Sequence, residues 1–171
     1  MKIRKLTEEN RAKVYALLRQ AFPRSDYEAN LVQALHEHGI PLHEWICIHT
    51  NKVVAYLAFS NAYHGNTVCG LHLAPMAVAP DFQKQGIGSE LLRFALRQEP
   101  IRDQTLFVLG ATRFYKRFGF DPCRVPVCPL TTDNAHFLCL RNSATDNFVV
   151  GYEAEFRTAG KPPKNPKNQR R

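Results

Sequence analysis

A glycine-containing turn is the feature of this sequence best suited to chemistry. The apolar run 71–78 leads to the segment Gln83-Lys84-Gln85-Gly86-Ile87-Gly88-Ser89, after which apolar residues recur with helical spacing as far as Leu96. A helix that begins in this way exposes unpaired backbone N–H groups at the positive end of its dipole. Glycine lets a ligand approach that backbone closely. The pattern predicts a phosphate or pyrophosphate site built from the N–H groups of residues 83–89, with Lys84 adding charge from the side.

Three common phosphate-binding motifs do not fit this turn. The dinucleotide fingerprint G-x-G-x-x-G needs a third glycine at the position occupied by Leu91. A Walker loop needs the triplet Gly-Lys-Ser/Thr, which does not occur in the chain. A protein-kinase loop needs further signature segments that this sequence lacks. The remaining pattern is Gln83-x-x-Gly86-x-Gly88, preceded by Val78-x-Pro80.

This pattern resembles the Gln/Arg-x-x-Gly-x-Gly/Ala signature of the GCN5-related N-acetyltransferase (GNAT) superfamily, whose members bind acetyl-coenzyme A. A second segment, Phe114-Tyr115-Lys116-Arg117-Phe118-Gly119-Phe120, resembles the short family helix that carries a tyrosine ahead of Gly-Phe. Segments 25–32, 74–78 and 109–110 extend the resemblance to the YhbS-like predicted acetyltransferases over most of residues 1–156. The alternative is a glycine turn and an aromatic core helix without a ligand.

The resemblance implies an α/β (α+β) fold, in which helices flank a mixed, mostly antiparallel sheet with splayed central parallel strands. It implies acetyl-CoA as co-substrate and no metal. In the family a strand bulge frees backbone groups that pair with the pantetheine arm, and Pro75 fits such a bulge because it cannot donate a ladder hydrogen bond. Met76 and Val78 would bind the arm, and an N–H near Met76 would form an oxyanion hole. An ordinary buried strand is the alternative.

Tyr115 is the candidate general acid, because a protonated phenol could stabilise or protonate the departing thiolate. Core packing is its alternative, since it shares a helical face with other aromatic residues.

The residue that would accept the proton of the amine is less defined. Such a base is needed because an alkylamine with a pKa near 10.4 is only about one part in two thousand neutral at pH 7. His72 shares the strand alternation of Met76, where some family members carry an acidic base, although a strand histidine is often structural. Glu28 lies on an apolar helical stripe, but Ser25-x-x-Glu28 is also a capping box. A water molecule that relays the proton to either group is a further alternative.

Hydrophobic periodicity predicts the elements that position these residues. Turns are expected at 51–52 and 64–66. Strands are predicted at 3–7, 45–48, 53–59, 68–78, 105–109, 137–141 and 148–156, and helices at 7–22, 25–38, 86–98 and 111–118. The sequence contains no internal repeat, and its 171 residues suffice for one core. Residues 1–156 are therefore predicted to form one N-acetyltransferase domain.

Composition restricts the other classes of function. The net charge is +8, but residues 157–171 hold six basic residues and no acid, so removing these six charges leaves +2 for residues 1–156. This basic tail is predicted to be disordered. A solubilising role is favoured over non-specific contact with nucleic acid, and no specific nucleic-acid binding is expected. The sequence shows no transmembrane segment and no signal peptide. Its five cysteines form no C-x-x-C pair, which favours reduced thiols and a cytoplasmic location.

These observations predict an acetyl-CoA-dependent N-acetyltransferase that acts on a primary amine by direct attack in a ternary complex. The acceptor could be a small molecule, a peptide N-terminus or a lysine. A coenzyme-A-binding regulatory module without turnover is the alternative. The acyl-chain preference and the oligomeric state stay open, with a homodimer as one option because many relatives pair.

Overall fold

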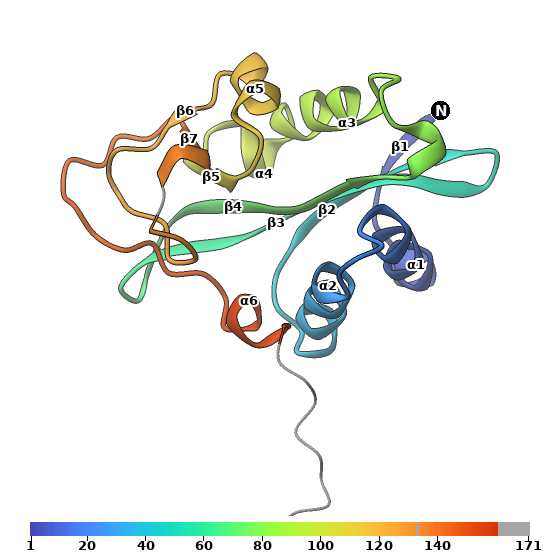
Figure 1. The fold of residues 1–171 in the computed structure, drawn as a ribbon, viewed down its shortest axis with the longest axis horizontal. Coiled ribbons are helices and arrows are strands. Elements are labelled where there is room, and N and C mark those ends of the chain that lie inside the picture. Colours follow the sequence, from blue (N-terminus) through green and yellow to red (C-terminus); the bar gives the residue numbers. More distant parts are fainter. Residues whose placement is uncertain (133, 161–171) are drawn as a thin grey trace, which may run out of the picture.

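A seven-stranded sheet forms the centre of the computed structural model, which describes residues 1–132 and 134–160 (Figure 1). The strand order is β1-β2-β3-β4-β5-β7-β6. The strands are β1 (Lys2–Lys5), β2 (His43–His49), β3 (Lys52–His64), β4 (Thr67–Val78), β5 (Leu106–Leu109), β6 (Asp121–Pro122) and β7 (Phe137–Leu140). Neighbouring strands run antiparallel except β4 and β5, which are parallel. The predicted mixed, mostly antiparallel sheet is confirmed.

Helices cover both faces of this sheet. The helices are α1 (Arg11–Ala21), α2 (Tyr27–Glu37), α3 (Ile87–Leu96), α4 (Glu99–Arg102), α5 (Thr112–Tyr115) and α6 (Glu155–Thr158). In Figure 1, α3, α4 and α5 lie on one side of the sheet, and α1, α2 and α6 lie on the other. Short 3₁₀ turns cover Glu8–Asn10, Pro80–Phe82, Lys116–Phe118 and Asn134–His136. The sheet therefore separates two layers, as the resemblance implied.

The apolar periodicity of the sequence explains the two cores. In α1, Val14, Leu17 and Leu18 are buried against the sheet, on one helical face. In α3, the buried Leu91 and Leu92 pack with strand residues on the opposite side of the sheet. Such burial contributes about 1.5–3 kcal/mol for each large aliphatic side chain.

Two hairpins connect the central strands. β2 and β3 join through Thr50 and Asn51, whose φ angles of 46° and 63° suit a tight turn between twisted strands. β3 and β4 join at Gly65, which has a φ of 60°. The second turn lies where the sequence predicted it, and the first lies one residue before the predicted 51–52.

β4 contains an extra residue and then parts from β5. Leu57 of β3 lies opposite Met76, whereas Phe59 lies opposite Leu73, so the Ala74–Pro75 segment bulges by one residue. β5 pairs with β4 at Leu71 and His72, after which β4 continues to Val78 without it. The bulge expected at Pro75 and the splayed parallel pair are both present.

The strand expected at 148–156 is wrong. This segment makes isolated bridges, Val149 with Val127 and Gly151 with Tyr63, and it ends in α6. Its aromatic side chains stack on histidines instead, Phe148 on His64 and Tyr152 on His72. The alternation that suggested a strand thus reflects side-chain packing beside the sheet rather than a ladder.

α6 crosses the expected end of the domain after residue 156, and Ala159 still packs beside buried Leu31 and Leu35. The rest of the predicted tail, residues 161–171, lies outside the described residues. Across residues 1–132 and 134–160, no helix is both long enough and apolar enough to span a bilayer.

Candidate active site

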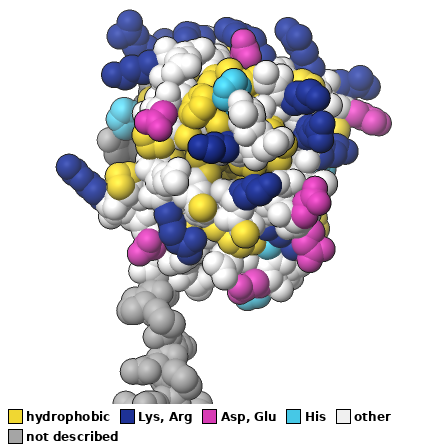
Figure 2. Space-filling model, turned by 90° about the vertical axis from the view of Figure 1, so that its right-hand side faces the viewer, with side chains coloured by type: hydrophobic (Ala, Val, Ile, Leu, Met, Phe, Trp, Pro, Cys, Tyr) yellow, Lys and Arg dark blue, Asp and Glu magenta, His cyan; other side chains and the backbone are white. Residues whose placement is uncertain are grey.

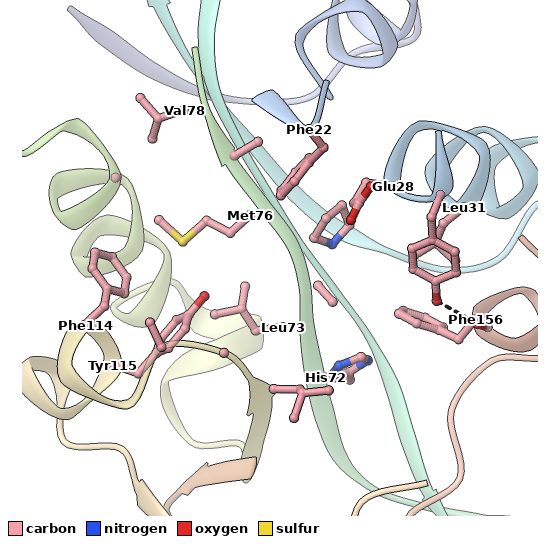
Figure 3. Close-up of a pocket in the computed structure, with 18 of the residues that line it drawn as sticks. Phe22, Glu28, Leu31, His72, Leu73, Met76, Val78, Phe114, Tyr115 and Phe156 are labelled. Carbon is pink, nitrogen blue, oxygen red and sulfur yellow. Dashed lines mark hydrogen bonds between the residues drawn. The ribbon is translucent and has the colours of Figure 1, made fainter. Parts of the chain in front are cut away.

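A cavity of about 700 Å³ lies where β4 and β5 part. Its lining falls into two groups on either side of β4, as Figure 3 shows. The donor half consists of Met76, Val78, Gln83, Gly88, Phe114 and Tyr115. The acceptor half includes Phe22, Tyr27, Glu28, Leu31, His72 and Phe156.

The outer edge of β4 faces this cavity without a neighbouring strand after His72. Ala79 N–H donates to the carbonyl oxygen of Val54 over 2.8 Å, so these two residues form a hydrogen-bonded pair. Because bonded and non-bonded pairs alternate along an antiparallel ladder, Met76 and Val78 belong to the non-bonded set. Their N–H and C=O groups therefore point away from β3, into the gap left by β5. An extended ligand could add to this edge like another strand.

The turn after β4 places the first N–H groups of α3 beside that edge. Gly86 begins the helix with a φ of 82°, which favours glycine. Glu90 N–H donates to Gly86 O, so the N–H groups before it lack a carbonyl partner within the helix. A Cβ on Gly88 would lie 3.1 Å from Met76 Cε, so glycine permits the close approach of α3 to β4. The geometry suits an anion at the helix start.

The side chains of this turn serve different purposes. Lys84 and Gln85 are exposed, whereas Ile87 and Ser89 are buried. Gln83 Nε2 donates to Val78 O over 3.1 Å, and Gln85 Nε2 donates to Asp81 O over 2.9 Å. Both amides thus shape the turn, so that any ligand contact from residues 83–89 falls mainly to the backbone and to Lys84.

Arg117 is a residue that the sequence argument did not select. Its guanidinium lies 4.9 Å from the Phe114 ring centroid, and Nη2 donates to Ser89 Oγ over 3.4 Å. A second positive charge is thus held at the start of α3. The signal was present, because Arg117 belongs to the same segment as Tyr115.

Basic side chains also surround the outer end of this turn. The loop after β4 lies at the right-hand end of the molecule in Figure 1, beside β1 and the β2–β3 turn. Figure 2 views that end and shows Lys and Arg side chains spread over the face, with hydrophobic side chains between them and fewer Asp and Glu side chains. Such a distribution favours the approach of an anionic ligand.

Tyr115 is held rigidly in the donor half. Its ring packs edge-on against Phe114 and Phe120, and a Cβ on Gly110 would lie only 2.6 Å from its Cε2. Burial raises the pKa of Tyr115 to about 12. Its hydroxyl points into the space beside Met76 in Figure 3. The phenol is therefore protonated at neutral pH and able to donate.

Glu28 lies across β4 from Tyr115, in the acceptor half (Figure 3). Ser25 Oγ accepts a hydrogen bond from Tyr27 N–H over 3.1 Å, but Ser25 N–H donates to Phe22 O rather than to Glu28. Only the serine half of the expected capping box forms, so the capping explanation of Glu28 is wrong. Its Oε2 is buried and has no hydrogen-bond partner among residues 1–132 and 134–160.

His72 does not share a face with Met76 and Val78, contrary to the sequence expectation. The extra residue at Ala74–Pro75 reverses the alternation between them. His72 stacks on Tyr152 with ring centroids 3.6 Å apart, and desolvation lowers its pKa to about 3. Its imidazole is neutral at physiological pH, and Nδ1 has no partner in the described part of the chain.

The described residues contain no group of three or more His, Cys, Asp or Glu side chains that could hold a metal ion. Each of the five cysteines is free. The side chains that line the cavity, among them Glu28, His72 and Tyr115, offer hydrogen bonding and proton transfer.

Comparison with known proteins agrees with this geometry. Residues 41–122 match the family model described as Acetyltransferase (GNAT) domain. An Escherichia coli K12 protein named "Uncharacterized N-acetyltransferase YjhQ" is 35% identical over 102 residues, and the match spans 56% of each protein, about half of that relative.

Solved structures match over more of the chain. YhbS of Escherichia coli, a GNAT family N-acetyltransferase in complex with CoA, aligns with a TM-score of 0.82 and 25% identity, covering 91% of both chains. A GNAT family acetyltransferase from Brucella melitensis in complex with acetyl-CoA aligns with a TM-score of 0.76 and 27% identity, covering 91% of this chain and 97% of its own. Residues 41–122, which hold the glycine turn, the tyrosine helix and the parted strands, thus match the GNAT acetyltransferase domain, and the chain shares the fold of these two GNAT structures.

Proposed function

We propose that this protein transfers the acetyl group of acetyl-CoA to a primary amine by direct attack in a ternary complex. One observation carries the proposal: the open backbone edge of β4 at Met76 and Val78 leads from the first N–H groups of α3 into a cavity that contains Tyr115. The two relatives that hold CoA and acetyl-CoA support the choice of ligand.

The cofactor would lie along the donor half. Backbone N–H groups of residues 83–89 would bind the pyrophosphate, with Lys84 and Arg117 adding positive charge. The pantetheine arm would pair with the outward backbone groups of Met76 and Val78. Gly88 leaves room for this arm because it carries no side chain beside Met76.

The reaction would begin when the amine nitrogen attacks the thioester carbon and forms the C–N bond. The carbonyl oxygen gains negative charge, which the N–H of Met76 would stabilise. When the intermediate collapses, the C–S bond breaks and its electron pair goes to sulfur. Tyr115 would supply a proton to that sulfur and recover one from solvent. An ammonium acceptor thus yields the amide, coenzyme A thiol and one released proton.

Glu28 is the proposed acceptor of the amine proton, directly or through a water. It lies in the acceptor half with one buried, unpartnered oxygen among the described residues. His72 also lines the cavity, but it is a weaker candidate because a group with a pKa of about 3 retains a proton poorly. We assign His72 a structural role in the cavity wall, where it stacks on Tyr152.

The reducing cytoplasm is the proposed compartment, since the five free cysteines are buried or half-buried without a disulfide.

Two measurements test the proposal. Titration calorimetry should show one acetyl-CoA bound per chain, and thiol release with a panel of amines should show turnover that requires both substrates. Binding without release for any amine would favour the regulatory alternative. Absence of acetyl-CoA binding at saturating concentration would overturn the assigned site.

A further inference from the structure

We infer that the acceptor is a small amine with one positive charge placed a few atoms from an apolar, aromatic-sized group. This inference rests on the proposed acetyl transfer and names the substrate class of the same site. Phenethylamine is the simplest probe with these properties. The charge, the walls and the rigidity of the acceptor half favour such an amine.

Charge in the cavity comes from one carboxylate. Glu28 is the only Asp, Glu, Lys or Arg among the described residues that line it. Its Oε2 is buried and lacks a hydrogen-bond donor in the described chain, although a buried carboxylate oxygen requires one. An ammonium group supplies up to three donors and the opposite charge. A polycation would bring further ammonium groups to a lining that has no second acid for them.

The walls around Glu28 are apolar. Phe22, Leu31 and Phe156 line the acceptor half, and all three lie on the Glu28 side of β4 in Figure 3. Leu130 also lines the cavity and is 40% exposed, so an apolar group bound beside it would remove its surface from water. An acceptor with an apolar group would cover these surfaces, whereas a sugar or a polyamine would not.

The spacing between charge and wall is short. Glu28 and Leu31 are three residues apart on α2 and therefore project from the same helical face, with Cβ atoms about 5–6 Å apart. The ammonium and the apolar group of the acceptor must then be separated by only a few carbon atoms. A lysine side chain, whose amine ends a four-carbon stem, fits this spacing less well than an arylalkylamine.

The wall is also held in place before any ligand binds. Tyr27 Oη donates to the carbonyl oxygen of Phe156 over 2.6 Å, which ties α6 to α2 (Figure 3). Phe156 is packed against Leu31 and Leu35. A preformed wall of this kind favours ligands that match its shape.

Thiol release at saturating acetyl-CoA tests the inference with four probes: phenethylamine, ethylamine, spermidine and kanamycin A. We expect kcat/KM for phenethylamine to exceed that of each other amine at least tenfold. Calorimetry of phenethylamine with the CoA-bound protein provides a readout that does not depend on turnover.

Variants separate the contributions of charge and wall. Glu28→Gln should lower kcat/KM for phenethylamine at least tenfold, with unchanged affinity for CoA. Glu37→Gln makes the same chemical change at an exposed position of α2 and should have no effect. Leu31→Ala should raise the KM of phenethylamine several-fold while that of ethylamine stays the same.

The outcomes distinguish the two proposals. Loss of CoA binding would refute the proposed function itself. Intact CoA binding with spermidine or kanamycin A as the better substrate, or with no turnover of any of the four amines, would overturn the acceptor class. Equal effects of Leu31→Ala on phenethylamine and ethylamine would also overturn it.

Discussion

Gln83 Nε2 donates a hydrogen bond to the carbonyl oxygen of Val78 over 3.1 Å. Val78 O points away from β3, so the bond uses the outer edge of β4 to fix the turn that precedes α3. The open edge of the strand and the first N–H groups of the helix are thereby held in one arrangement. Gln83 thus positions the proposed cofactor site through its side chain, in addition to any contact from its backbone.

Replacing Gln83 by leucine should weaken acetyl-CoA binding. The change removes one neutral hydrogen bond, which contributes about 1 kcal/mol, so the Kd from calorimetry should rise about fivefold. Gln98→Leu is a matched control, because Gln98 Nε2 donates to Phe94 O over 3.0 Å at the far end of α3. Equal Kd values for the two variants would show that the Gln83 bond does not position the site.

Gly86→Glu should abolish cofactor binding, with a loss of affinity above about 100-fold. The new carboxylate would compete with the pyrophosphate at the start of α3, and charge repulsion would oppose the anion. Gly65→Glu is the control for backbone strain, since Gly65 has a φ of 60° compared with 82° for Gly86, and neither has an atom within 4 Å of an added Cβ. Both variants should lose about 1–2 kcal/mol of stability, but only Gly86→Glu should lose acetyl-CoA binding.

Tyr115→Phe should lower kcat by about 100-fold and leave the Kd of acetyl-CoA unchanged, because the phenol acts on the leaving thiolate. Burial raises the pKa of Tyr115 to about 12, so its deprotonation should not reduce kcat between pH 7 and about 11. Tyr15→Phe is the control, because Tyr15 Oη bonds to His36 Nδ1 over 2.7 Å outside the cavity lining. Unchanged turnover in Tyr115→Phe would remove the phenol from the mechanism.

Patterns confined to a few neighbouring residues predicted much of the fold and part of the site. The periodicity of α3, the turn at Asn51 and the glycine at 86 each act locally, and each lies where the sequence placed it. The proline at position 75 also predicted the position of the bulge in β4. Local signals suffice there because backbone conformation and one buried face decide the outcome.

The side-chain environments were harder to predict. A single extra residue in β4 turned His72 to the opposite face, and strict alternation gives no warning of such a shift. The capping pattern at Ser25 offered a second explanation for Glu28, and it gave no sign that Ser25 N–H donates to Phe22 O and leaves Glu28 to line the cavity. Phe156 of α6 also lines the cavity, and it lies 129 residues after Tyr27, whose hydroxyl donates to the Phe156 carbonyl oxygen. Such contacts depend on the tertiary fold.

Burial of His72 should make the protein less stable in acid. Its folded pKa of about 3 lies below the ordinary histidine value of 6.5. Between these two pKa values His72 is protonated in the unfolded chain but neutral in the folded protein. Stability is therefore greatest above pH 6.5 and falls as the pH drops toward about 3. Each pH unit in this window costs about 1.4 kcal/mol. Between pH 7.5 and 5, the free energy of unfolding should thus fall by about 2 kcal/mol from this residue.

Urea unfolding of His72→Phe at these two pH values measures that contribution, because phenylalanine keeps the stack on Tyr152 and removes the titrating group. The variant should lose about 2 kcal/mol less than the wild type on going from pH 7.5 to pH 5. His64→Phe is the control, since His64 also stacks on an aromatic ring, that of Phe148 at 3.7 Å, but is exposed. If His72→Phe and the wild type lose the same free energy, then His72 accepts a proton in the folded state, and its exclusion as the base no longer stands.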